Sequence, residues 1–81
     1  MPQYTFNTVE AGDVREGSKV ELPKLQAVKE MATEYVGDLI KERDGSIFDR
    51  DIVIEVSDGD GLMLLRIAVV GLISPAARLA A

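Results

Sequence analysis

A single amphipathic segment, residues 23–43, separates two parts of this chain that each alternate like paired strands. Pro23 suits the first turn of a helix, because the amide hydrogens of that turn have no partner within the helix. One broad apolar stripe then follows at helical spacing, formed by Leu25, Val28, Met31, Ala32, Tyr35, Val36, Leu39 and Ile40. We therefore expect one helix that covers a sheet and ends at Asp44-Gly45.

Four segments have the pattern of β-strands: three alternate apolar and polar residues, and the fourth is an apolar run. The first is 3–9, and the second is a short strand at 19–22 that follows turn residues at 10–13 and 16–18. The third, 51–57, and the fourth, 62–70, flank a strong hairpin turn with the sequence Asp58-Gly59-Asp60-Gly61.

The fold class that follows is α+β: a four-stranded antiparallel sheet with one helix packed on one face, in the order β-β-α-β-β along the chain. The order of the strands in space stays open. We expect a single domain over residues 1–72 and an apolar C-terminal tail over 73–81, which forms either a short helix or a frayed end.

The residue types on which most catalytic sites depend are missing. Among 81 residues there is no Cys and no His, which excludes disulfides, thiolate metal sites, Cys nucleophiles and the usual general base. The glycines do not form a phosphate-binding loop that opens a helix. A net charge of −5 disfavours binding to nucleic acid, because it repels the phosphate backbone. We therefore predict no enzyme activity, no cofactor and no nucleic-acid partner.

Location is constrained by what the chain lacks. The longest apolar stretch, Leu62 to Ile73, is interrupted by Arg66 and is shorter than the roughly 20 residues that a membrane-spanning helix needs. The opening residues show neither the basic start nor the apolar run of a secretory signal. Together with the absence of Cys, this predicts a cytoplasmic protein with no membrane contact.

Three stretches of the sequence resemble a small bacterial family of short, mostly acidic proteins that is known only as a domain of unknown function. They are Met1-Pro2-Gln3-Tyr4-Thr5-Phe6, then Glu16-Gly17 with Glu21-Leu22-Pro23-Lys24-Leu25-Gln26-Ala27, then Ile54-Glu55-Val56-Ser57-Asp58-Gly59-Asp60-Gly61. The resemblance covers most of residues 1–70, and the chain departs from it at Asn7, where His or Asp is more usual. It implies the same fold and no activity.

An acidic column runs along the expected outer side of the helix. Glu30, Glu34, Asp38 and Glu42 stand at successive four-residue steps, so they share one face. Clustered acids speed encounter with cations, which makes this column a candidate docking site for a basic protein partner. The alternative interpretation is an ordinary solvated helix face.

Two acidic loops, residues 44–51 and 58–61, offer oxygen ligands of the kind that hard cations prefer. The stretch that starts at Asp44 fails the calcium-loop pattern, because its sixth position is Asp49 where a glycine is needed. Turn chemistry explains the Asp and Gly of the second loop without a metal. We predict no metal site, and we keep a small-ligand or divalent-cation-binding domain as the alternative function.

The fourth strand is apolar on both faces. Met63, Leu65, Ile67 and Val69 form one face, and Leu62, Leu64, Ala68 and Val70 with Arg66 form the other. One helix covers only one face of a sheet, so the tail 72–79 or a second copy of the chain must cover the other. We favour a homodimer that uses Leu62, Leu64, Ala68 and Val70, because two-fold dimers are the commonest assembly. The function that follows is a non-catalytic, self-associating interaction module with an acidic surface.

Overall fold

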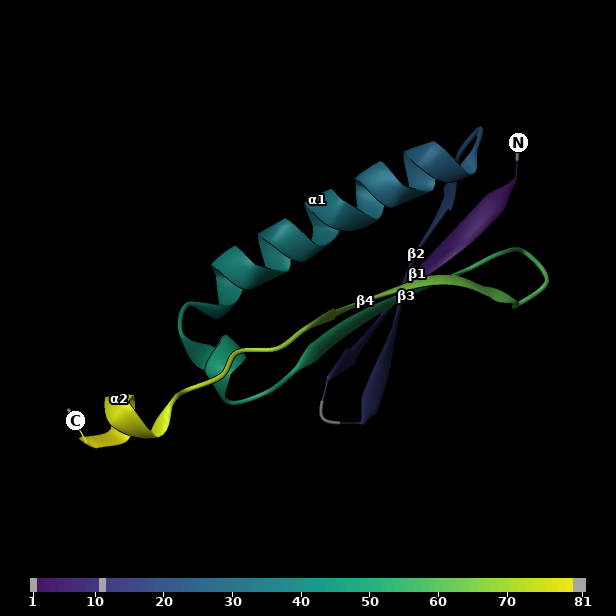
Figure 1. Ribbon diagram of the computed structural model, residues 1–81. Helices are drawn as coiled ribbons and strands as arrows, with labels where there is room; N and C mark the ends of the chain where they lie inside the picture. The colour runs from purple at the N-terminus through teal and green to yellow at the C-terminus, as the bar shows by residue number, and fades with distance from the viewer. Residues whose placement is uncertain (1, 11, 80–81) are drawn as a thin grey trace.

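Two hairpins and one long helix make up the computed structural model, which describes residues 2–10 and 12–79 (Figure 1). Residues 80–81 of the predicted tail lie outside the described part of the chain. The elements are β1 (Gln3–Glu10), β2 (Asp13–Glu21), α1 (Leu25–Arg43), the 3-10 helix η1 (Ser46–Phe48), β3 (Ile52–Ser57), β4 (Met63–Val69) and α2 (Pro75–Leu79). The predicted α+β class and the order β-β-α-β-β are confirmed.

The strands lie in the spatial order β2-β1-β3-β4, and every neighbouring pair is antiparallel. The two hairpins therefore join through β1 and β3, which form the centre of the sheet. This order makes β2 and β4 the edge strands. Helix α1 lies across one face of the sheet (Figure 1).

The core lies between α1 and the sheet face that carries Phe6, Ile54 and Val56, which are at most 2 % exposed. Strand alternation places these side chains on one face, and the helical repeat brings Val28 and Ala32 against them. Two residues of the predicted helix stripe, Leu25 and Ile40, stay exposed.

Strand β2 is longer than the short strand predicted at 19–22. Gly17 and Ser18, which looked like a turn, lie within β2 opposite Phe6, where the register with β1 shifts. A Cβ atom on residue 17 would overlap the backbone carbonyl oxygen of Phe6. Glycine is therefore needed at this irregularity, which lets β2 continue through the bulge.

Helix α1 ends where the sequence indicated, before Asp44-Gly45, and the residue with the positive φ is Asp44 and not the glycine. Asp44 has a positive φ of 53°, whereas Gly45 has an ordinary φ of −93°. One residue earlier, the guanidinium of Arg43 donates to the carboxylate of Glu10 at the end of β1. This ion pair joins the end of the helix to the end of a central strand.

Candidate interaction surface

The sheet face remote from α1 is polar over most of its width. Strand pairing sets two rows of side chains across it: Glu16, Asn7, Glu55 and Arg66 in one row, and Lys19, Thr5, Ser57 and Met63 in the next. Within the first row, Arg66 Nε lies 3.6 Å from Glu55 Oε1. A face of this kind can remain in water, so the expectation that it must be covered is wrong for most of the sheet.

A third row on the same face is apolar and consists of Val14, Val9, Val53 and Ala68. Val9 and Val53, on the central strands, are half-buried, whereas Val14 and Ala68, on the two edge strands, are exposed. The apolar part of the remote face is therefore a narrow band near the end of the first hairpin.

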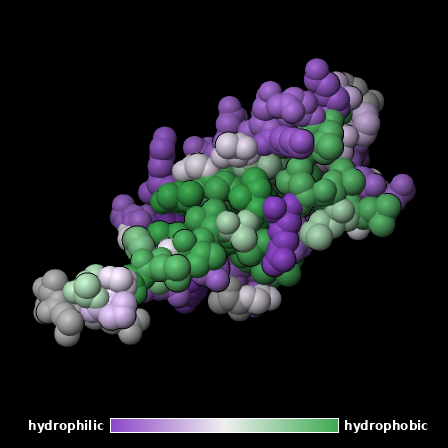
Figure 2. Space-filling view, in the orientation of Figure 1, coloured by the Kyte–Doolittle hydropathy of each residue, from purple (hydrophilic) through white to green (hydrophobic). Residues whose placement is uncertain are grey.

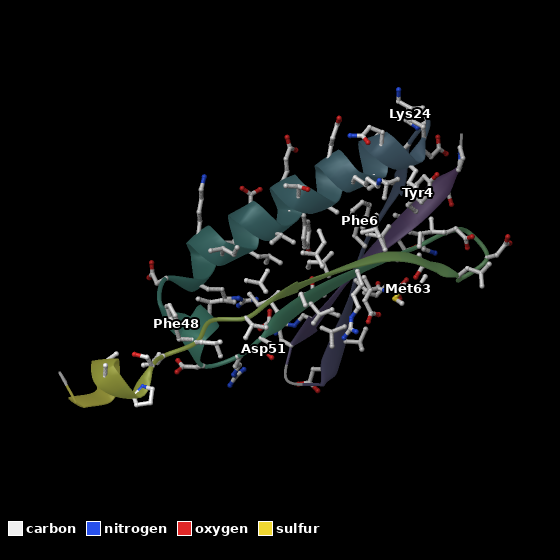
Figure 3. All side chains as sticks on the ribbon, viewed as in Figure 1. Tyr4, Phe6, Lys24, Phe48, Asp51 and Met63 are labelled. Carbon is white, nitrogen blue, oxygen red and sulfur yellow. The ribbon has the colours of Figure 1, made fainter. Side chains whose placement is uncertain are left out.

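Strand β4 begins with a register irregularity that moves Met63 away from the helix. Val56 pairs with Leu65 and Ser57 pairs with Met63, which leaves Leu64 as the extra residue. Met63 lies on the side of the sheet away from α1 and is 57 % exposed (Figure 3). The predicted shared face is therefore confirmed for Leu65, Ile67 and Val69 and is wrong for Met63.

Exposed large hydrophobic side chains gather on β4 and its two ends. Of the ten such residues in the described part of the chain, six lie between residues 62 and 73: Leu62, Met63, Leu64, Val70, Leu72 and Ile73. We call these six residues the β4 strip. The predicted self-association residues Leu62, Leu64 and Val70 belong to it, and Ala68 is exposed on the same strand.

The β4 strip belongs to a long apolar surface. Figure 1 is viewed from the β4 side of the sheet, and Figure 2 shows that hydrophobic residues extend along the length of this side, interrupted by one hydrophilic patch. Phe48, which is 50 % exposed, adds to this apolar surface. Large contiguous apolar patches on a protein surface mark contact sites.

The chain after β4 does not fold back over the sheet. It leaves past Phe48, where Gly71 packs so closely that an added Cβ would clash with the ring, and it runs outward to α2 (Figure 1). Leu72 is consequently 84 % exposed. The radius of gyration of 15.0 Å exceeds the roughly 12 Å typical of a compact chain of this length. Within the described residues, the tail 72–79 does not cover the outer face of the sheet, which was one of the two alternatives from the sequence.

The acidic column lies on the solvent side of α1. Glu30, Glu34, Asp38 and Glu42 are all exposed, and the side of the helix remote from the sheet is hydrophilic in Figure 2. Glu30 accepts a weak hydrogen bond from Gln26 Nε2 at 3.4 Å. The column and the β4 strip therefore belong to different surfaces of the domain.

In the second acidic loop, residues 58–61, the carboxylate of Asp58 has a structural role. Asp58 Oδ1 accepts hydrogen bonds from the backbone amides of Asp60 at 2.9 Å and Leu62 at 3.0 Å. This arrangement closes the turn between β3 and β4. Among residues 2–10 and 12–79, no three acidic side chains gather closely enough to hold a metal ion.

One cavity was not anticipated from the sequence, because its walls come from three separate segments. It has a volume of about 280 Å³ and is lined by Glu10, Arg43, Ser46, Asp49, Arg50 and Ile52. Two carboxylates and two guanidinium groups balance one another there, so the cavity has no net charge to attract an ion. The Nε atom of Arg43 is buried without a hydrogen-bond partner in the structure.

Comparison with known proteins gives one family match. The family model described as "Domain of unknown function (DUF6894)" matches residues 3–70, which include all four strands of the sheet and helix α1. The chain belongs to this family. No curated protein and no solved structure matches it.

The DUF6894 match ends at Val70, one residue beyond β4, so the outward-running residues 71–79 lie beyond the family match. Strand β4 and four of the six residues of the β4 strip lie inside it. None of the helices in the described part of this DUF6894 chain is long and apolar enough to cross a membrane.

Proposed function

We propose that this domain is a non-catalytic interaction module that associates with a second copy of itself through the β4 strip. The observation that carries the proposal is the concentration of exposed apolar side chains on one edge strand and its ends. Fully burying a Leu, Val, Ile or Met side chain contributes about 1.5–3 kcal/mol, so several half-exposed ones supply a substantial driving force for contact.

The position of the other exposed features supports a second copy as the occupant of this surface. The remote sheet face is mostly polar, and the acidic column lies on the outer side of α1, so neither competes with the β4 strip for apolar contact. Each chain carries a net charge of −5, yet β4 itself contains a single charged residue, Arg66. Contact through β4 therefore brings few like charges close together.

The experiment is light scattering on the separated peak of a size-exclusion column, over a series of concentrations up to the high micromolar range. The unaltered chain is expected to be a dimer. Leu64→Glu places a charge in the β4 strip and is expected to give a monomer with an unchanged circular dichroism spectrum. Val14→Glu is the matched control, because Val14 is 64 % exposed and lies on the opposite edge strand.

The comparison of the two variants distinguishes a specific interface from nonspecific hydrophobic association. A dimer that persists in Leu64→Glu, or one that Val14→Glu also dissociates, contradicts contact through the β4 strip. A monomer at every concentration of the unaltered chain contradicts self-association altogether.

The acidic column forms the second part of the proposal, as a docking site for a basic protein segment. Its support is that all four carboxylates are exposed on one helix face that self-association leaves free. An amide NMR titration with a Lys-rich peptide tests it: signals of residues 30–42 should shift, and a variant with Gln at all four positions should not respond. Equal shifts in that variant contradict the column as the site. We place this module in the cytoplasm, in keeping with a chain that has no Cys.

A further inference from the structure

The two edges of the sheet differ in how open they are to another strand. Edge strands present unpaired backbone groups, and proteins that avoid edge pairing protect them with charges, prolines or bulges. Strand β2 has such protection: its sequence carries five charged residues, Asp13, Arg15, Glu16, Lys19 and Glu21, and its pairing is broken near Gly17.

Strand β4 lacks this protection along most of its length. Its irregularity is confined to the first two residues, and from Leu65 to Val69 it pairs regularly with β3. Arg66 is the one charged residue in the strand, and it is held toward β3 by Glu55. On the side away from β3, no strand of the described part of the chain pairs with β4.

We infer that the second copy joins edge to edge, with β4 antiparallel to β4 of its partner and Ile67 directly opposite the same residue of the other copy. The two four-stranded sheets then form one continuous sheet with both α1 helices on the same face. This inference rests on the proposed function and specifies how the two copies meet.

Symmetry restricts the register of such a pair. In an antiparallel pair, directly opposed residues point to the same face of the sheet. A two-fold axis perpendicular to the sheet therefore passes between one residue and the same residue of the second copy. An axis at Arg66 sets two guanidinium groups directly opposite each other, which is destabilising. An axis at Ile67 instead sets each Arg66 opposite Ala68, whose small side chain leaves room for it.

The register centred on Ile67 also uses the exposed residues of the strand. Leu64 then lies opposite Val70, and Leu65 lies opposite Val69 on the helix face. Leu64 and Val70 are 43 % and 55 % exposed in the single chain, so this pairing brings two unburied apolar side chains together.

Disulfide trapping tests the register directly, because the chain has no native Cys. Two single variants, Arg66→Cys and Ala68→Cys, are oxidised separately and as an equimolar mixture. Directly opposed residues lie about 4.5–5.5 Å apart between Cα atoms, within the range of a disulfide. The mixture is expected to form the disulfide-linked heterodimer, which peptide mass spectrometry identifies, and each variant alone is expected to remain largely unlinked.

The possible results separate the register, the mode of contact and the proposed function. Rapid linking of Arg66→Cys alone indicates an axis at that residue, and rapid linking of Ala68→Cys alone indicates an axis there; either overturns the Ile67 register. A dimer by light scattering that links in none of the three samples overturns the Ile67 register and leaves self-association intact, and amide hydrogen exchange in β4 then decides whether the edges pair in another register. A monomer overturns both.

Amide hydrogen exchange gives an independent readout that needs no cross-link. In an edge strand only alternate amides are bonded, whereas a strand paired on both sides has every amide bonded. All amides from Leu65 to Val69 are therefore expected to exchange slowly in the dimer. In monomeric Leu64→Glu, alternate ones are expected to exchange at least about tenfold faster. Unchanged alternation in the dimer excludes edge pairing.

Discussion

The same small substitution, glycine to alanine, is expected to have opposite effects at two positions of this chain. At Gly17, the added Cβ would overlap the backbone carbonyl oxygen of Phe6. At Gly37, inside α1, no atom other than those of the adjacent helix backbone lies within 4 Å of the added Cβ. One methyl group therefore reports on the irregularity of β2 in the first case and on helix propensity in the second.

The magnitudes follow from these surroundings. The carbonyl oxygen and carbonyl carbon of Phe6 are backbone atoms, so they cannot rotate away from the added methyl group. Gly17→Ala therefore forces β1 and β2 apart locally and is expected to lower the free energy of unfolding by about 2–3 kcal/mol. Alanine favours a helix interior over glycine, so Gly37→Ala is expected to raise it by about 0.5–1 kcal/mol. A chain of 81 residues has a total of roughly 4–12 kcal/mol, so both changes are measurable.

Thermal and urea unfolding followed by circular dichroism measure both variants at one fixed protein concentration, because association with a second copy adds to stability. For a domain of this size 1 kcal/mol corresponds to about 4–8 °C. Gly17→Ala is expected to lose about 10–20 °C in Tm, and Gly37→Ala to gain about 5 °C. A Gly17→Ala variant within 0.5 kcal/mol of the unaltered chain would refute the close approach at the bulge, and a destabilised Gly37→Ala would refute the open surroundings of that helix position.

Two further substitutions test the core and the second hairpin by urea unfolding. Ile54 is fully buried in a central strand, so Ile54→Ala is expected to lower the free energy of unfolding by about 3 kcal/mol and Ile54→Val by about 1 kcal/mol; equal effects of the two would contradict a packed site. Asp58→Ala removes the acceptor of two backbone amides and is expected to lower it by about 1 kcal/mol, whereas Asp60→Ala, the control in the same turn, should change it by less than 0.5 kcal/mol.

Local sequence patterns were enough to predict the fold class and most element boundaries. The helical stripe from Val28 to Leu39 and the alternation of Ile52, Ile54 and Val56 predict α1 and β3, because burial on one face imposes those periods. The Asp58-Gly59-Asp60-Gly61 turn between two apolar runs predicts the second hairpin. In these places local preference and tertiary packing agree.

The rest depended on contacts between distant segments. Gly17-Ser18 has the composition of a turn, and only the approach of Phe6 shows that it is a bulge within β2. Alternation predicts that Met63 faces inward, but an irregularity opposite Ser57 reverses it, and no local signal marks that irregularity. The sequence predicted Leu62, Leu64, Ala68 and Val70 as a self-association surface, and all four are exposed in the structure. The position of this surface at an edge was not predicted, because the spatial order of strands is set by long-range pairing.

The unequal edges of the sheet also determine how far assembly by strand pairing can extend. A sheet with two receptive edges can add copies without limit and become a filament. Here one edge strand is charged and irregular, and the other is apolar and pairs regularly from Leu65 to Val69. If β4 pairs with β4 of a second copy, both receptive edges are occupied and the outer strands of the assembly are two copies of β2. Assembly then stops at two chains, because the pairing of β4 that promotes association also leaves no receptive edge for a third chain.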